Sequence, residues 1–429
     1  MKTKTFLFVA AAISTFNLQP STLFAQGPLT PPGAPALAMK TLDQIDAKLE
    51  KRTPITFLSY FISEPGSYYV VSNLTAAGGP NDGIVIAAND VSLDLNGFTL
   101  DGGGTGGSGV HVGFGNHTNV LVRNGTIRGW AGDGVDAANT SNSRFENLRI
   151  SNNGLIGINV GSGGTVSGCS VQGSSATGIA TGDGCVVKDC VSKDNTGGSS
   201  DGIATANDCT VSGCAASHNG RYGINTLGGC TISGGTASTN NAGGIQADDG
   251  CLISHCNVER NGTTGIGCGG GNLVEHCTAR NNAADGIATG DGSRVAGCTS
   301  SVNGLRGVST GHHCTISGCT IDSNTGSGVT FGRYSAVIEN NCVGNGNGGS
   351  TAGILTVFEY SRIEGNHLAV NVANGIKVNG PGNLIIKNSV FGANPASNYV
   401  VVATSFLGPT NNLIGGVITN QNPWANFSY

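Results

Sequence analysis

A glycine followed by isoleucine or valine recurs along this chain at nearly constant spacing. From Gly202 to Gly328 six successive intervals are all 21 residues, and the other intervals lie between 21 and 26 residues. A self-similar unit of this length is typical of repeat architectures, in which each unit stacks on its neighbours. These marker glycines are Gly83, Gly109, Gly134, Gly157, Gly178, Gly202, Gly223, Gly244, Gly265, Gly286, Gly307, Gly328, Gly353 and Gly375.

Each unit contains three short strand patterns separated by bends. In one unit these are the strand after Gly202 and the strands at residues 209–211 and 214–216. No 3.6-residue period runs through the units, which excludes helical repeats. We therefore predict an all-β chain that forms a single parallel β-helix of about 13 coils, each 21–26 residues long.

An asparagine closes each unit at a fixed place. Asparagine tolerates the left-handed backbone conformation, and its amide can hydrogen-bond to the equivalent amide one coil away. The column therefore predicts an asparagine ladder at a recurrent bend. Its members, each 21 residues apart, are Asn219, Asn240, Asn261, Asn282, Asn303, Asn324 and Asn345.

Composition agrees with a turn-rich β fold and excludes several classes. The chain has 72 glycines in 429 residues but only 12 prolines, and the glycines keep no three-residue period, so it is not collagen. Hydrophobic residues make up 38% and the net charge is −5, which argues against disorder. Acidic residues outnumber basic ones, so the composition does not indicate a surface that binds nucleic acid.

The two ends differ from the repeats. Residues 1–25 have lysines before an apolar run, as in a signal peptide, so we expect a protein that is secreted, periplasmic or held at the cell surface. Residues 26–63 are expected to be a linker and a capping helix, with a helical stripe over residues 39–52. The repeats take residues 64–394 and a C-terminal cap residues 395–429. No later segment is long and apolar enough to be predicted as a membrane span. We expect the protein to be a monomer.

The fourteen cysteines align in columns that face the core. Seven share one inward register and five share another, so we interpret them as free, buried thiols. Disulfides within or between coils remain the alternative. Column spacing supplies no tetrahedral cluster for zinc. The columns are Cys169, Cys190, Cys214, Cys256, Cys277, Cys298 and Cys319, and Cys185, Cys209, Cys230, Cys251 and Cys314; Cys342 and Cys268 fall on other inward positions.

Calcium is not supported by the spacing of the acidic residues. Asp183, Asp249 and Asp291 share one turn column. Asp249 and Asp291 are two coils apart, ~10 Å, whereas calcium ligands lie about 2.4 Å from one ion. We interpret these residues as turn formers, and we expect no required cofactor and no metal.

The outward position two residues after the marker glycine carries polar side chains on three early coils. Coil stacking would bring His111 and Asp136 within hydrogen-bond or one-water reach, as a proton-transfer pair. Asp133 directly precedes Gly134, the marker glycine of the coil that carries Asp136, and could form a carboxylate pair with Asp136. The candidate catalytic residues are therefore His111, Asp136 and Asp133, and the candidate binding residues are Arg128, Trp130 and Asn159. The alternative is a solvated polar ladder with a turn aspartate and a packed tryptophan.

The chain resembles the secreted right-handed parallel β-helix repeat proteins of the pectin-lyase-like superfamily. The resemblance covers nearly the whole mature chain and is carried by the repeats, by residues 64–69, 94–99 and 124–130, and by the ending at residues 423–427. It implies a right-handed β-helix whose partner is an extracellular polysaccharide, with lyase or glycosidase activity as an open question. The alternative is a non-catalytic surface or structural solenoid, or an adhesion protein.

Overall fold

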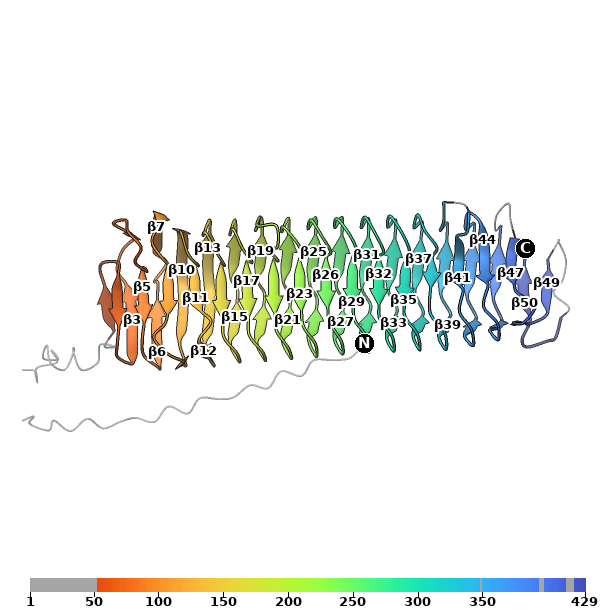
Figure 1. Ribbon diagram of the computed structural model, residues 1–429, viewed down its shortest axis with the longest axis horizontal. Helices are drawn as coiled ribbons and strands as arrows, with labels where there is room; N and C mark the ends of the chain where they lie inside the picture. Colours follow the sequence, from red (N-terminus) through yellow and green to blue (C-terminus); the bar gives the residue numbers. More distant parts are fainter. Residues whose placement is uncertain (1–51, 348, 393–396, 414–419) are drawn as a thin grey trace, which may run out of the picture. The chain divides into compact units, whose positions relative to one another are not determined.

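The computed structural model describes residues 52–347, 349–392, 397–413 and 420–429. In these residues the regular elements are all strands. Most coils contribute one strand to a smaller sheet and two to a larger sheet, and strands of successive coils pair in parallel and in register, as β11 does with β14. Figure 1 shows the coils stacked in sequence order. This part of the chain is a single parallel β-solenoid.

The smaller sheet has sixteen strands, one for each coil. They are β2 (Tyr60–Ile62), β5 (Ile84–Ile86), β8 (Val110–Val112), β11 (Val135–Ala137), β14 (Ile158–Val160), β17 (Ile179–Thr181), β20 (Ile203–Thr205), β23 (Ile224–Thr226), β26 (Ile245–Ala247), β29 (Ile266–Cys268), β32 (Ile287–Thr289), β35 (Val308–Thr310), β38 (Val329–Thr330), β41 (Ala352–Thr356), β44 (Asn374–Val378) and β47 (Ser397–Val401).

The larger sheet has thirty-two strands. They are β1 (Thr53–Ile55), β3 (Gly66–Val70), β4 (Leu74–Thr75), β6 (Val91–Asp94), β7 (Thr99–Thr105), β10 (Leu121–Trp130), β13 (Arg144–Ser151), β15 (Thr165–Ser167), β16 (Ser170–Gln172), β18 (Val186–Lys188), β19 (Val191–Lys193), β21 (Thr210–Ser212), β22 (Ala215–Ser217), β24 (Thr231–Ser233), β25 (Thr236–Ser238), β27 (Leu252–Ser254), β28 (Asn257–Glu259), β30 (Leu273–Glu275), β31 (Thr278–Arg280), β33 (Arg294–Ala296), β34 (Thr299–Ser301), β36 (Thr315–Ser317), β37 (Thr320–Asp322), β39 (Ala336–Ile338), β40 (Asn341–Val343), β42 (Arg362–Glu364), β43 (His367–Ala369), β45 (Leu384–Ile386), β46 (Ser389–Phe391), β48 (Phe406–Leu407), β49 (Thr410–Asn412) and β50 (Asn426–Ser428). Strands β9 (His117–Thr118) and β12 (Thr140–Ser141) form a separate pair.

The predicted number of coils, about 13, is too low. Fourteen strands of the smaller sheet follow or contain a marker glycine, but the first and the last do neither. The register places Ser59 at the position of Gly83, and Asn398 at the position of Gly375. Both end coils therefore lack the sequence signal while they keep the strand pairing, and they account for two of the coils that the prediction omitted.

The expected caps fall partly outside the described residues. The predicted signal peptide and nearly all of the helical stripe over residues 39–52 lie there. At the other end, residues expected to form a cap contain strands that continue the ladders: β47 pairs with β44, and β50 pairs with β46.

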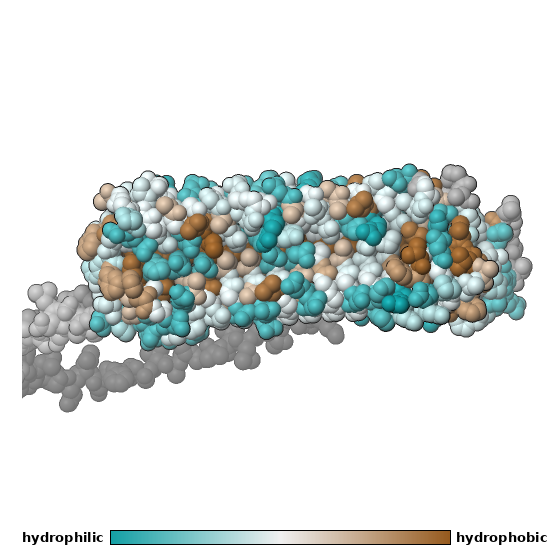
Figure 2. All heavy atoms as spheres, viewed as in Figure 1, coloured by the Kyte–Doolittle hydropathy of each residue, from teal (hydrophilic) through white to brown (hydrophobic). Residues whose placement is uncertain are grey.

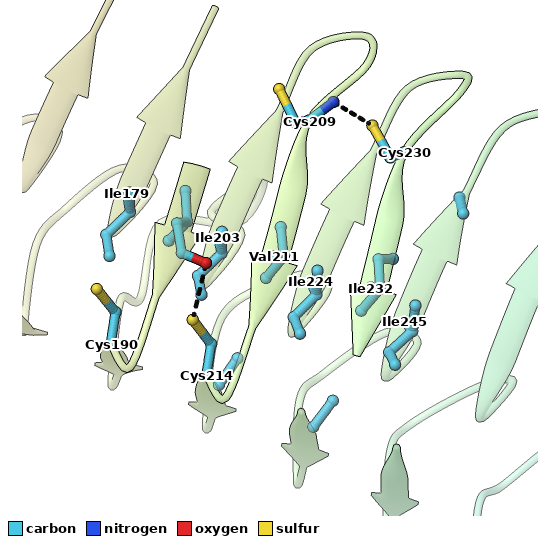
Figure 3. Packing of buried hydrophobic residues seen from close by; sticks show 14 of the residues in the cluster. Ile179, Cys190, Ile203, Cys209, Val211, Cys214, Ile224, Cys230, Ile232 and Ile245 are labelled. Atoms are coloured by element: carbon cyan, nitrogen blue, oxygen red, sulfur yellow. Dashed lines mark hydrogen bonds between the residues drawn. The ribbon is translucent and has the colours of Figure 1, made fainter. Parts of the chain in front are cut away.

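The core is a stack of apolar columns between the two sheets. The first residue of most strands of the smaller sheet is a buried isoleucine or valine, and the middle residue of most strands of the larger sheet meets it from the opposite side. Figure 3 shows this packing for Ile203, Ile224 and Ile245 against Val211 and Ile232. Because no single coil can bury its inner face alone, the solenoid is stable only as a stack.

The asparagine ladder is confirmed. Asn240 donates from Nδ2 and from its backbone N–H to Oδ1 of Asn261, each at 3.0 Å, and Asn261 repeats this pattern with Asn282. The amides are buried. The left-handed residue, however, is the one before each ladder asparagine, such as Arg260 before Asn261. The asparagine is therefore placed there for its amide and not for its backbone conformation.

The cysteine columns are free thiols and also a second set of ladders. All fourteen cysteines lie in the described residues and none is bonded to another; thirteen are buried and Cys268 is half-buried. The backbone N–H of Cys209 donates to Sγ of Cys230 at 3.3 Å (Figure 3). The backbone N–H of Cys230 donates in the same way to Sγ of Cys251, also at 3.3 Å. Further along the same column, the backbone N–H of Cys251 donates to Oδ1 of Asn272, and that of Asn272 donates to Oγ of Ser293. The thiols thus satisfy buried N–H groups, in addition to filling the core.

Candidate functional site

His111 and Asp136 lie on neighbouring strands of the smaller sheet and point outward. The register of β8 and β11 places them side by side, and Nδ1 of His111 lies 3.0 Å from Oδ2 of Asp136. Their side chains are 26% and 30% exposed, respectively. The contact expected from coil stacking is therefore present, and both groups are open to a ligand from solution.

Asp133 lies beside this pair and is mostly buried. It is 7% exposed, and its Oδ1 accepts the backbone N–H of Ile156 at 2.7 Å. Burial raises the pKa of Asp133 to about 6, with a further rise from the charge of Asp136. The hydrogen bonds from Ile156 and Asn159 and the charge of His111 act in the opposite direction. A carboxyl group with this pKa exchanges its proton near neutral pH.

Three other coils carry an aspartate at the same position, Asp82, Asp201 and Asp285, and the two that are buried show what is special about Asp133. Asp201 and Asp285 also precede a marker glycine and are also buried. Nε of Arg221 donates to Asp201 at 2.8 Å, and Nε of Arg306 donates to Asp285 at 3.0 Å. In the part of the chain that the structure describes, Asp133 forms no ion pair with Arg or Lys. It is the buried aspartate of this column that lacks a guanidinium partner.

Asn159 extends the cluster by one coil. It pairs in register with Asp136 through β11 and β14, and its side chain acts to lower the pKa of Asp133. The four polar residues of three successive coils, His111, Asp133, Asp136 and Asn159, form one continuous group, which we call the acid–base cluster.

Two exposed phenylalanines next to the cluster were missed by the sequence reasoning. Phe114 is 80% exposed and has a left-handed φ of 68°. Its ring centroid lies 6.4 Å from that of His111 and 5.9 Å from that of Phe61, which is 53% exposed. A bulky residue in this conformation without burial suggests a function. The signal in the sequence is a phenylalanine between Gly113 and Gly115 just after a strand.

Trp130 and Arg128 do not join the cluster. Trp130 is 1% exposed, and its Nε1 donates to the backbone oxygen of Leu100, so the packed alternative holds and the expected stacking on a ligand is wrong. Arg128 lies on β10 of the larger sheet and pairs with Asp101, with Nη2 at 2.7 Å from Oδ2. Arg128 therefore lies on the other sheet, whereas the Trp130 ring is packed inside, against Gly83 and Gly109 just before β5 and β8.

The turn aspartates hold backbone N–H groups of the next coil. Oδ1 of Asp249 accepts from Gly270 at 2.6 Å, and Oδ1 of Asp291 accepts from His312 at 2.7 Å. Their expected role as turn formers is confirmed. Among the described residues no group of three or more His, Cys, Asp or Glu side chains is arranged to hold a metal ion. A search of the same residues found no helix that meets the length and hydropathy needed to cross a membrane.

Stacked three-strand coils, ladders of buried side chains and a polar outer face define a parallel β-helix protein. A family model described as a right-handed β-helix region matches residues 62–231 and 197–314, more than half of the chain. The chain belongs to this family, which confirms the resemblance to right-handed parallel β-helix proteins. None of the curated proteins matches the chain.

Several solved structures are similar at low identity. The A-module of the mannuronan C-5 epimerase AlgE6 of Azotobacter vinelandii is 18% identical, with 76% of this chain and 91% of that chain covered and a TM-score of 0.43. A mutant of the periplasmic alginate epimerase AlgG is 12% identical, with coverages of 85% and 82% and a TM-score of 0.37. The pectate lyase Pel9A is 15% identical, with coverages of 74% and 70% and a TM-score of 0.27.

Proposed function

We propose that this chain is an exported β-helix protein that binds extracellular polysaccharide on the outer face of its smaller sheet and acts on it at the acid–base cluster. The observation that carries the proposal is the pairing of a half-buried, solvent-accessible His111–Asp136 contact with a buried Asp133 that has no guanidinium partner. Environments that push the pKa values of neighbouring carboxyl groups apart are typical of acid–base sites. Export is the expectation from residues 1–25.

The exposed members of the cluster are the groups that reach a ligand. Asp136 holds Nδ1 of His111, which leaves Nε2 of the imidazole free to accept or donate a proton. Asp133 lies behind them, and its carboxyl group gains or loses a proton near pH 6. This arrangement supports two reaction classes. In hydrolysis one group protonates the glycosidic oxygen while another activates water. In elimination one group removes a C–H proton next to a carboxylate, the glycosidic C–O bond breaks as the double bond forms, and another group protonates the departing oxygen.

The sheet face beyond the cluster favours neutral or weakly charged glycans. Its outward residues from β17 to β32 are uncharged, and several are as small as Ala180, Ala204 and Gly267. Figure 2 shows the surface in its view as mostly pale and teal, with small separate brown clusters. A polyanion would find few cations here, whereas sugar hydroxyl groups need only hydrogen-bond partners and a shallow surface.

A non-catalytic structural solenoid is the second candidate, because most of the buried polar groups serve the ladders and not a site. The asparagine and cysteine columns run through many coils and act on stability alone. Such a rod keeps its shape and its binding properties when Asp136 is replaced.

Product release from a panel of neutral and uronic-acid polysaccharides, read by mass spectrometry, tests the proposal. Wild type, Asp136→Asn and the control Asp183→Asn are compared, each with calcium and with chelator. Asp183 is a turn aspartate that accepts the N–H of Asn207, so its variant makes the same chemical change away from the cluster. We expect wild type and Asp183→Asn to release products and Asp136→Asn to release at least tenfold less.

The masses of the products identify the reaction, since elimination gives a product one water lighter than hydrolysis does. Equal release by all three proteins would discard the acid–base cluster as the site. Release by none of them, with glycan binding retained, would favour the structural solenoid.

A further inference from the structure

The smaller sheet carries a second feature well away from the acid–base cluster, a polar hollow of about 470 Å³. It lies over β26, β29, β32 and β35, where the outward residues Gly267 and Ala288 are small and form its floor. Other lining residues are Tyr222, Gln246, Thr264, Asp285, Arg306 and Ser309. We call this feature the distal hollow.

The hollow exists because side-chain size changes along one column of the solenoid. The residues that precede successive marker glycines form one wall, and they are Tyr222, Gly243, Thr264, Asp285 and Arg306. Gly243 has no side chain and is covered by the Tyr222 ring, and Thr264 is short, so a gap opens between the tyrosine ring and the arginine. The large residues at the two ends close it along the solenoid.

Both ends of the hollow are held in place by ion pairs. The Arg306 guanidinium contacts Asp285 through Nε at 3.0 Å and through Nη2 at 2.9 Å. At the other end, the Arg221 guanidinium lies over the Tyr222 ring, 5.1 Å from its centroid, and is itself bound to Asp201. Because these side chains are fixed before a ligand arrives, less conformational entropy is lost on binding.

The charge of the hollow is balanced. Each arginine is paired with a buried aspartate, and the remaining lining side chains, among them Gln246 and Ser309, are uncharged. A concave, polar and electrically neutral site with an aromatic ring at one end fits an uncharged polyhydroxylated ligand. The hydroxyl groups of a sugar would meet Gln246, Ser309 and the free guanidinium N–H groups, and its C–H face would meet the tyrosine.

The distance between the distal hollow and the acid–base cluster indicates how the two sites could act together. The centre of the hollow, between β29 and β32, is six to seven coils from β11, and at ~4.8 Å per coil this is about 30 Å along the sheet. We infer that the distal hollow is a second glycan-binding site that takes uncharged sugar units and anchors a long chain while the acid–base cluster acts about 30 Å away. The inference rests on the proposed function for the class of ligand.

A glycan that spans both sites binds by two linked contacts, so its affinity exceeds that of a short one that reaches only one site. Affinity should therefore rise steeply once the extended length of the oligosaccharide passes about 30 Å. Filling the hollow should remove this rise, so that long and short ligands bind with similar affinity.

Isothermal titration with size-graded oligosaccharides of one neutral glycan and one uronic-acid glycan tests the inference. Ala288→Leu fills the floor from an outward position, and Tyr222→Ala removes one end. Arg294→Ala is the control, since Arg294 is exposed on the larger sheet. We expect Ala288→Leu and Tyr222→Ala to bind the long neutral oligosaccharides at least tenfold more weakly than wild type, and Arg294→Ala to match wild type. Melting curves identify a variant that fails to fold. If one of the two hollow variants does so, the affinity of the other one tests the inference.

Unchanged affinity of folded Ala288→Leu for long neutral chains would overturn the inference, as would a wild-type preference for uronic-acid chains that Ala288→Leu abolishes. A different result would contradict the proposed function, namely that Asp136→Asn releases as much product as wild type. Loss of affinity in Ala288→Leu together with unchanged products in Asp136→Asn would keep the hollow and discard the cluster.

Discussion

Replacing Asp133 with asparagine measures how much the unpaired carboxylate in the acid–base cluster lowers the free energy of unfolding. The carboxamide oxygen can still accept the N–H of Ile156, but it cannot ionise. Burial raises the pKa of Asp133 from 3.8 to about 6. The folded chain therefore binds this proton more tightly than the unfolded chain does. The stabilisation is complete below about pH 4 and is lost as the pH rises through about 6.

The size of the effect follows from the pKa difference. The step from 3.8 to about 6 corresponds to a ceiling of about 3 kcal/mol at about 1.4 kcal/mol per pH unit. Water reaches part of the cluster and screens the charge, so we expect about 1–2 kcal/mol. Asp133→Asn should melt at the wild-type temperature near pH 4 and about 1–3 °C higher than wild type at pH 8.

Thermal unfolding followed by circular dichroism from about pH 4 to pH 8 measures this difference. Asp285→Asn is the matched control, because Asp285 occupies the same position in its coil but is paired with Arg306. That variant should melt lower than wild type at pH 8, since it leaves a guanidinium without its counter-charge. A melting temperature of Asp133→Asn that is equal to or below wild type at pH 8 would refute the reasoning.

Three further predictions concern the ladders and the ligand. Cys251→Ala leaves the N–H of Cys230 without its acceptor and should cost about 1–3 kcal/mol in the free energy of unfolding, whereas Cys251→Ser should cost less; urea denaturation of both variants measures this. Asn261→Ala breaks the ladder on both sides and should cost about 3 kcal/mol or more in the same assay, and a cost below that of Cys251→Ala would contradict it. Phe114→Ala should weaken glycan binding about tenfold in titration calorimetry, by about 1.4 kcal/mol, while Tyr334→Ala, at an exposed ring on another coil, should leave the affinity unchanged.

The repeat made much of the fold predictable. A period of 21 residues fixes which positions stack, so the asparagine ladder and the inward cysteine columns followed from the sequence alone. The register also predicted the contact between His111 and Asp136, because residues at equivalent places in neighbouring coils meet side by side. Where the signal was lost, at Ser59 and Asn398, the coils went uncounted although the pairing continued.

Other features depend on three-dimensional surroundings that a column of residues does not contain. The sequence could not show that the thiol of Cys251 accepts a backbone N–H, since the position of that N–H depends on the bend of the preceding coil. Trp130 is buried because several glycines leave room for its ring. The unpaired state of Asp133 became visible only by comparison with Asp201 and Asp285, whose arginine partners lie about one coil further along the chain.

A crystal structure of Asp136→Asn with the oligosaccharide that wild type binds most tightly is the most direct test of the central claim, that the acid–base cluster is where a glycan meets this solenoid. We expect a sugar ring on the smaller sheet, within hydrogen-bond distance of His111 and in contact with Phe114. An oligosaccharide that occupies the larger sheet, or that binds the smaller sheet without touching His111, would contradict it.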